Sequence, residues 1–103
     1  MDFTIEDKGH EKRVLLSGSF TFADNQKFKE MMAAATEKLV KAIALDFNAV
    51  EFIDSGALGM LLLFREECQP RQISLSLNSA QGQVKKIFAI ARFDQLFAAA
   101  GNP

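Results

Sequence analysis

The chain has no tryptophan and no tyrosine, and it has only one cysteine and one histidine among its 103 residues. The single cysteine, Cys68, cannot form an internal disulfide, which is typical of proteins in a reducing compartment. Cys68 and His10 together are too few ligands for a structural zinc site. The glycine-rich pattern of a phosphate-binding loop is also missing. We therefore expect no metal and no cofactor.

An excess of charge of one sign and a long hydrophobic run are missing as well. The formal net charge is -1, which argues against nucleic acid as a main partner, because phosphate neutralisation requires clustered Lys and Arg. The longest apolar run, residues 57–64, is far shorter than the roughly 20 residues of a membrane-spanning helix. The N-terminus lacks the basic and apolar regions of a signal peptide. We expect a cytoplasmic protein that does not insert into a membrane.

The residues that are present are those of a globular domain, with 49% hydrophobic and 24% charged residues. Ten phenylalanines favour a dry core over a surface that stacks on bases or sugars. At this length, residues 1–103 form a single domain, because two hydrophobic cores would not fit.

Alternating apolar residues predict the strands. Phe3 and Ile5 alternate with polar neighbours, and residues 13–17 form a second strand that pairs with the first as a hairpin. The nearly continuous apolar run 42–47 predicts a central strand, residues 48–51 a link, and a short strand then ends at Ile53. Residues 73–77 predict another strand.

Helices are predicted between these strands. Thr21 and Asp24 have the spacing of a capping box, and the helix they begin should run to about Val40, with Leu39 on its apolar stripe. A second helix follows Ser55, and a third leads to Ala91. Residues 95–100 are ambiguous between a short helix and an edge strand. The order predicts an α/β fold: a mixed four- to five-stranded sheet with an N-terminal hairpin and helices packed on it.

The stretch 52–64 carries most of the functional argument, because Ser55 lies where a strand turns into a helix. One interpretation is that Ser55 is the helix N-cap, a role for which Ser is among the best residues. Another is a phosphorylation site, where the phosphate would face backbone N–H groups and the positive end of the helix. A hydrolase nucleophile is disfavoured, because no Gly precedes Ser55 by two residues and the only histidine lies in a distant turn.

The helix after Ser55 has an apolar arc of about 200°, about twice what a surface helix needs. Its members are Ala57, Leu58, Met60, Leu61, Leu62, Phe64 and Cys68, and Leu63 lies outside it. Either the helix is unusually buried, or part of the arc is a docking surface for a partner. Gly59 destabilises a helix interior by roughly 1 kcal/mol relative to Ala, which suggests that this domain or a partner packs closely against it.

The sequence Phe52-Ile53-Asp54-Ser55, followed by Gly56-Ala57-Leu58-Gly59 and an apolar helix, resembles the phosphorylation motif of STAS domains. More narrowly, it is similar to single-domain anti-sigma factor antagonists, and the similarity extends over nearly the whole chain. The motif departs from the commoner pattern at two positions, with Gly56 in place of a second Ser and Ala57 in place of a Gly. Ser55 is then the only hydroxyl in the turn.

The resemblance implies a non-enzymatic switch that regulates transcription. A partner serine kinase, often itself an anti-sigma factor, would bind the unphosphorylated protein and release it after phosphorylating Ser55, and a serine phosphatase would reset the system. The residues expected to contact the partner are Thr21, Asp24, Asp54, Gly56, Ala57, Met60, Leu63 and Phe64. The alternatives are an unphosphorylated STAS interaction subunit of a transporter ATPase complex and a regulator linked to two-component signalling.

Overall fold

A four-stranded mixed sheet runs through the computed structural model, which describes residues 1–97. Strands β1 (Asp2–Lys8) and β2 (Glu11–Phe20) form an antiparallel hairpin. Strands β3 (Ala42–Ile53) and β4 (Ser74–Asn78) continue the sheet in parallel, in the order β1-β2-β3-β4. The predicted hairpin and mixed sheet are therefore confirmed.

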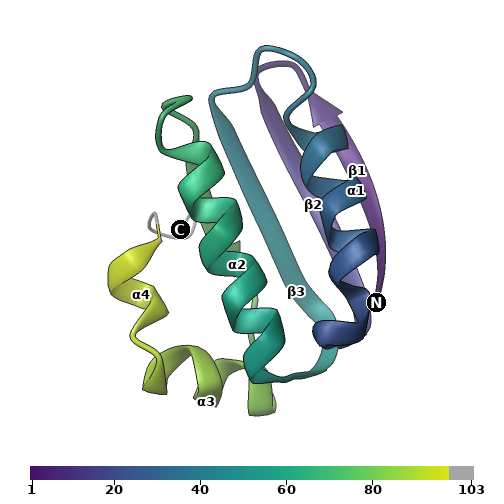
Figure 1. Ribbon diagram of the computed structural model, residues 1–103, viewed down its shortest axis with the longest axis vertical. Coiled ribbons are helices and arrows are strands. Elements are labelled where there is room, and N and C mark those ends of the chain that lie inside the picture. The colour runs from purple at the N-terminus through teal and green to yellow at the C-terminus, as the bar shows by residue number, and fades with distance from the viewer. Residues whose placement is uncertain (98–103) are drawn as a thin grey trace.

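The helices pack on this sheet. A 3₁₀ turn, η1 (Phe22–Asp24), leads into α1 (Asn25–Ala35), and α2 (Ser55–Cys68) follows β3. The chain continues after β4 with α3 (Gly82–Ile90) and α4 (Phe93–Leu96). Figure 1 shows α1 and α2 on the same face of the sheet, with α3 and α4 on the far side of α2 from α1. No helix within residues 1–97 combines the length and the apolar character needed to cross a membrane.

The first helix is shorter than predicted. It ends at Ala35 and not near Val40, and Leu39 lies beyond it with 75% of its surface exposed. Thr36 caps the last turn, because both its hydroxyl and its N–H donate to the carbonyl of Met32. The following residues must return the chain to the sheet, where the Lys41 N–H donates to the His10 carbonyl at 2.7 Å.

The third strand is longer than predicted. Residues 48–51, expected to be a link, continue β3 without interruption to Ile53. They stay in the strand because β2 pairs with β3 all the way to its end, with Phe20 opposite Ile53. Two shifts in the register, one at Leu15–Ser17 and one at Gly18–Ser19, let the twelve residues of β3 pair along the ten residues of β2. The strand therefore delivers residues 54 and 55 directly to the start of α2.

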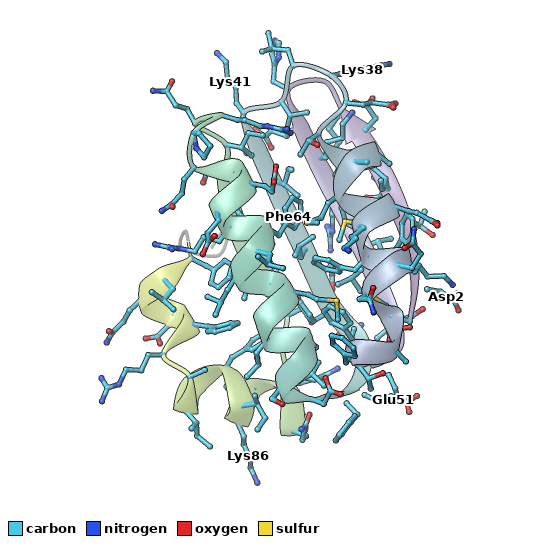
Figure 2. The ribbon with its side chains drawn as sticks, viewed as in Figure 1. Asp2, Lys38, Lys41, Glu51, Phe64 and Lys86 are labelled. Atoms are coloured by element: carbon cyan, nitrogen blue, oxygen red, sulfur yellow. The ribbon has the colours of Figure 1, made fainter. Side chains whose placement is uncertain are left out.

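Phenylalanines fill the core between the sheet and the helices, as predicted. Phe28 of α1 stacks on Phe20 at 5.1 Å between ring centroids and meets Phe64 of α2 edge-on at 5.9 Å. Figure 2 labels Phe64 on the side of α2 that faces α1. Phe47 of β3 meets Phe88 edge-on at 5.1 Å, which holds α3 against the sheet. These contacts hold α1, α2 and α3 in place around the sheet.

Cys68 is the last residue of α2 and is buried in the core. Burial raises the pKa of the Cys68 thiol to about 11. The thiol is therefore protonated and inaccessible under ordinary conditions. The α4 helix resolves part of the ambiguity at 95–100 in favour of a helix, while residues 98–100 lie outside the described part of the chain.

Candidate functional site

Ser55 is the first residue of α2 and is exposed. The N-cap is not Ser55, as one interpretation of the sequence had it, but Asp54, whose Oδ1 accepts from the Ala57 N–H at 2.9 Å. The reason is conformational: the backbone of Asp54 is extended, with φ -116° and ψ 179°, and the helix begins at the next residue, Ser55. Within residues 1–97, the Ser55 hydroxyl makes no hydrogen bond. Its side chain is therefore exposed to solvent.

The Asp54 carboxylate also joins two turns that are distant in the sequence. Its Oδ2 accepts from the backbone N–H of Phe22 at 3.2 Å, while Oδ1 caps α2. The turn that carries Ser55 is thereby tied to the turn that begins η1. A capping carboxylate of this kind stabilises a helix by about 1 kcal/mol.

Thr21 and Asp24 form the predicted capping box, although the turn they begin is a 3₁₀ turn before it becomes α1. The Asp24 Oδ2 accepts from the Thr21 N–H at 2.8 Å, and its Oδ1 accepts from the amino group of Met1 at 3.1 Å. Burial raises the pKa of Asp24, but these two donors together outweigh it, so the pKa lies below its ordinary value. Asp24 therefore serves to order the turn next to Asp54.

Phe22 lies directly against Gly56. A Cβ at position 56 would come within 2.5 Å of the Phe22 Cβ and 3.1 Å of its Cα, so only glycine fits there. This explains the departure from the commoner motif, in which a second Ser occupies this place. Gly59, for which the sequence suggested a close contact, has nothing within 4 Å of where a Cβ would be. The close approach lies three residues earlier than predicted, and Gly59 faces open space.

An apolar groove begins beside this contact. It has a volume of about 210 Å³ and runs between η1–α1 and α2. We call it the α1–α2 groove; its lining residues are Phe22, Asn25, Phe28, Lys29, Met32, Met60 and Leu63. Phe22 and Leu63 are large apolar side chains with 64% and 53% of their surfaces exposed. A surface of this kind suits the docking of an apolar side chain from another protein.

The residues expected to contact a partner fall into two groups. Leu63 lines the α1–α2 groove at its surface and Met60 at its floor, while Asp54 and Gly56 hold the turn at its end. The side chains of Ala57 and Phe64 are completely buried, so they belong to the core and not to a surface.

Most of the apolar arc of α2 is therefore accounted for by burial within the fold. Ala57, Met60, Leu61, Phe64 and Cys68 are all buried. The exposed apolar residue is Leu63, which lies outside the arc. Sequence reasoning gave Phe22 no role, because its contacts with Asp54 and Gly56 join parts of the chain that are more than thirty positions apart. Its neighbour in space, Gly56, was the available signal, since an unexpected glycine often marks a close approach.

The STAS domain family model matches residues 4–102, and the chain therefore belongs to the STAS domain family. It is 35% identical over 92 residues to a STAS-domain-containing protein of Pseudomonas aeruginosa, a match that covers 86% of this chain and 87% of that protein.

Two solved structures have the same fold. TM1081 of Thermotoga maritima superposes with a TM-score of 0.83 at 16% identity and covers 97% of this chain and 86% of its own. The anti-sigma factor antagonist SpoIIAA in its unphosphorylated form superposes with a TM-score of 0.72 at 15% identity, covering 99% and 89%. At these identities the comparison establishes the fold, which is that of the anti-sigma factor antagonists.

Proposed function

We propose that this STAS domain is a non-enzymatic phospho-switch of the anti-sigma factor antagonist type, in which Ser55 accepts the phosphate. The observation that carries the proposal is the free, exposed hydroxyl of Ser55 at the start of α2, next to the α1–α2 groove. SpoIIAA, which has the same fold, has been solved in an unphosphorylated and in a phosphorylated form. The partners would be a serine kinase that is also an anti-sigma factor and a serine phosphatase, all in the cytoplasm.

The phosphorylation step needs only a hydroxyl from this chain. The Ser55 Oγ attacks the γ-phosphorus of ATP bound to the kinase, the bond to the bridging oxygen breaks, and ADP leaves. The hydroxyl proton passes to a base of the kinase. Hydrolysis by the phosphatase transfers the phosphoryl group to water and restores Ser55.

The switch follows from charge. In the unphosphorylated protein the partner covers the neutral Ser55 and inserts an apolar side chain between Phe22 and Leu63 of the groove. Phosphorylation adds about -1.5 to -2 charges at neutral pH. The neighbouring Asp54 carboxylate, which accepts from two N–H groups, is itself an anion and cannot neutralise the phosphate. Covering the phosphate with an apolar surface would be unfavourable by several kcal/mol, and the complex dissociates.

The test is to purify the protein from its native cells, measure its intact mass, and identify what is bound to it. We expect a phosphate adduct that maps to Ser55 and a bound kinase that is present only with the unphosphorylated protein. Ser55→Ala should hold the partner in the presence of ATP, and Ser55→Glu should weaken binding at least tenfold. Equal binding of Ser55→Glu and wild type at the same salt concentration would refute the switch. Co-purification with a transporter ATPase and no phosphate would favour the alternative role as an interaction subunit.

A further inference from the structure

The side chain of Gln83, near the start of α3, is paired with the last residue of β3. Its Oε1 accepts from the Ile53 N–H at 3.0 Å, and its Nε2 donates to the Ile53 carbonyl at 2.9 Å. A primary amide offers one acceptor and two donors. Here it satisfies the N–H and the C=O of one residue, as a neighbouring strand would.

This pairing replaces a strand that is too short. The β3–β4 ladder ends where Asp46 faces Asn78, so the last seven residues of the twelve-residue strand β3 extend past it. At the near end of this extension, Gln81 donates to the Asn48 carbonyl at 2.7 Å. At the far end, Gln83 holds Ile53, which is buried and directly precedes Asp54 and Ser55.

We infer that Gln83 is a positioning residue for Ser55, an inference that rests on the proposed phosphorylation of that serine. Gln83 fixes the backbone of Ile53, and the next residue, Asp54, must reach the N–H groups of both Ala57 and Phe22 with one carboxylate. This is possible only while the end of β3 is held in place. The Ser55 hydroxyl follows one residue later, so its direction depends on the same anchor.

The first experiment measures amide hydrogen exchange in the isolated protein for wild type, Gln83→Ala and Gln83→Glu. Gln83→Glu keeps an acceptor for the Ile53 N–H but places a carboxylate against its carbonyl. We expect the amides of Phe22, Ile53 and Ala57 to exchange about tenfold faster in both variants, because local opening becomes easier. The matched control is Gln81→Ala, which removes the other amide contact of the same helix start and should leave Phe22 and Ala57 unchanged. Unchanged exchange at these amides in both Gln83 variants would overturn the inference, whether or not Ser55 is phosphorylated.

The second experiment measures phosphorylation kinetics with the co-purified kinase and ATP. A positioning role predicts that kcat falls about tenfold in Gln83→Ala, because a misplaced nucleophile reacts slowly. KM should stay within about twofold, because the groove that binds the kinase is untouched. A rise in KM with unchanged kcat would overturn the inference, because it would make Gln83 a binding residue. If wild type is not phosphorylated, the proposed function fails by itself, and the exchange experiment still decides the role of Gln83.

Discussion

At the scale of single residues, the structural role and the proposed chemical role belong to two neighbouring residues, Asp54 and Ser55. Asp54 caps α2 and bridges to Phe22, which leaves Ser55 without a structural duty in the described part of the chain. A serine that also capped the helix would have to give up its bond when modified. Ser55 can change its charge without uncapping the helix, because the cap is one residue away.

The two glycines of α2 form a matched pair for mutation. Gly56→Ala should destabilise the protein by about 1–3 kcal/mol, because the new methyl group overlaps Phe22, whose Cα is also close. Gly59→Ala should stabilise it by up to about 1 kcal/mol, because that position is open and Ala favours the helix. Urea unfolding measures both. If Gly56→Ala stabilised the protein and Gly59→Ala destabilised it, the close approach would be at residue 59.

Asp54 can be tested by removing one or both of its functions. Asp54→Ala removes the cap and the bridge to Phe22 and should cost about 1–2 kcal/mol. Asp54→Asn keeps one oxygen for the Ala57 N–H but presents an NH₂ group to the Phe22 N–H, so its effect should be intermediate. Thermal unfolding of the three proteins gives the order. If Asn were as destabilising as Ala, the cap would contribute nothing and the bridge would contribute everything.

At the scale of elements, the helix α2 shows how far the sequence could predict the site. The periodicity of α2 predicted its apolar arc, because burial follows the helical repeat. It could not predict which apolar residue stays exposed, because this depends on how close α1 lies to α2. The α1 helix ends at Ala35, five residues before the predicted end. Leu63 shares the groove with Asn25, Lys29 and Met32 of α1, and the space between the two helices leaves it at the surface.

The same limit applies to the strands. Alternation identified Phe3, Ile5 and the run 42–47, because each has its own local pattern. The extension of β3 through residues 48–51 depends on pairing with β2 and on the side-chain amide of Gln81, the residue before α3, which are contacts between distant parts of the chain. Asp54 and Ser55 were found from the motif, while Phe22 and Gln83 act only through residues at least thirty positions away.

Two leucines of α2 should behave oppositely on mutation. Leu63→Gln should change the free energy of unfolding by no more than about 0.5 kcal/mol, because the side chain is exposed. It should weaken partner binding at least tenfold if the groove is the docking surface. Leu61→Ala, in the core, should cost about 2–5 kcal/mol.

The control for binding is Ile90→Gln, which changes an apolar residue that is 79% exposed on α3, outside the groove. Binding should be unaffected. If Ile90→Gln weakened binding as much as Leu63→Gln, the partner would be recognising exposed apolar surface in general.

At the scale of the whole molecule, both ends of α2 are buried in one core, with Ala57 near its start and Cys68 at its end. Leu61, Phe64 and Cys68 lie along one side of the helix, all inside. Unfolding of the core on this side of the helix therefore exposes the thiol. Cys68 reports on the stability of the whole core.

The thiol should react slowly with alkylating reagents in the native protein. Near pH 8 only about one thiol in a thousand is ionised when the pKa is about 11, and the side chain is also inaccessible. Labelling followed by mass spectrometry should show a rate far below that of a cysteine peptide, and urea should raise it to the peptide value. A native rate equal to that of the peptide would mean that the C-terminal end of α2 is open in solution.

The position of Phe22 has a spectroscopic consequence. The chain contains no tryptophan and no tyrosine, so an indole placed at residue 22 would be its only strong fluorophore. That residue is mostly exposed, touches Gly56 and forms one wall of the groove. A Phe22→Trp protein would emit from the groove itself against an almost dark background. Its emission wavelength and quenching would report partner docking and the modification of Ser55 in real time, without an attached dye.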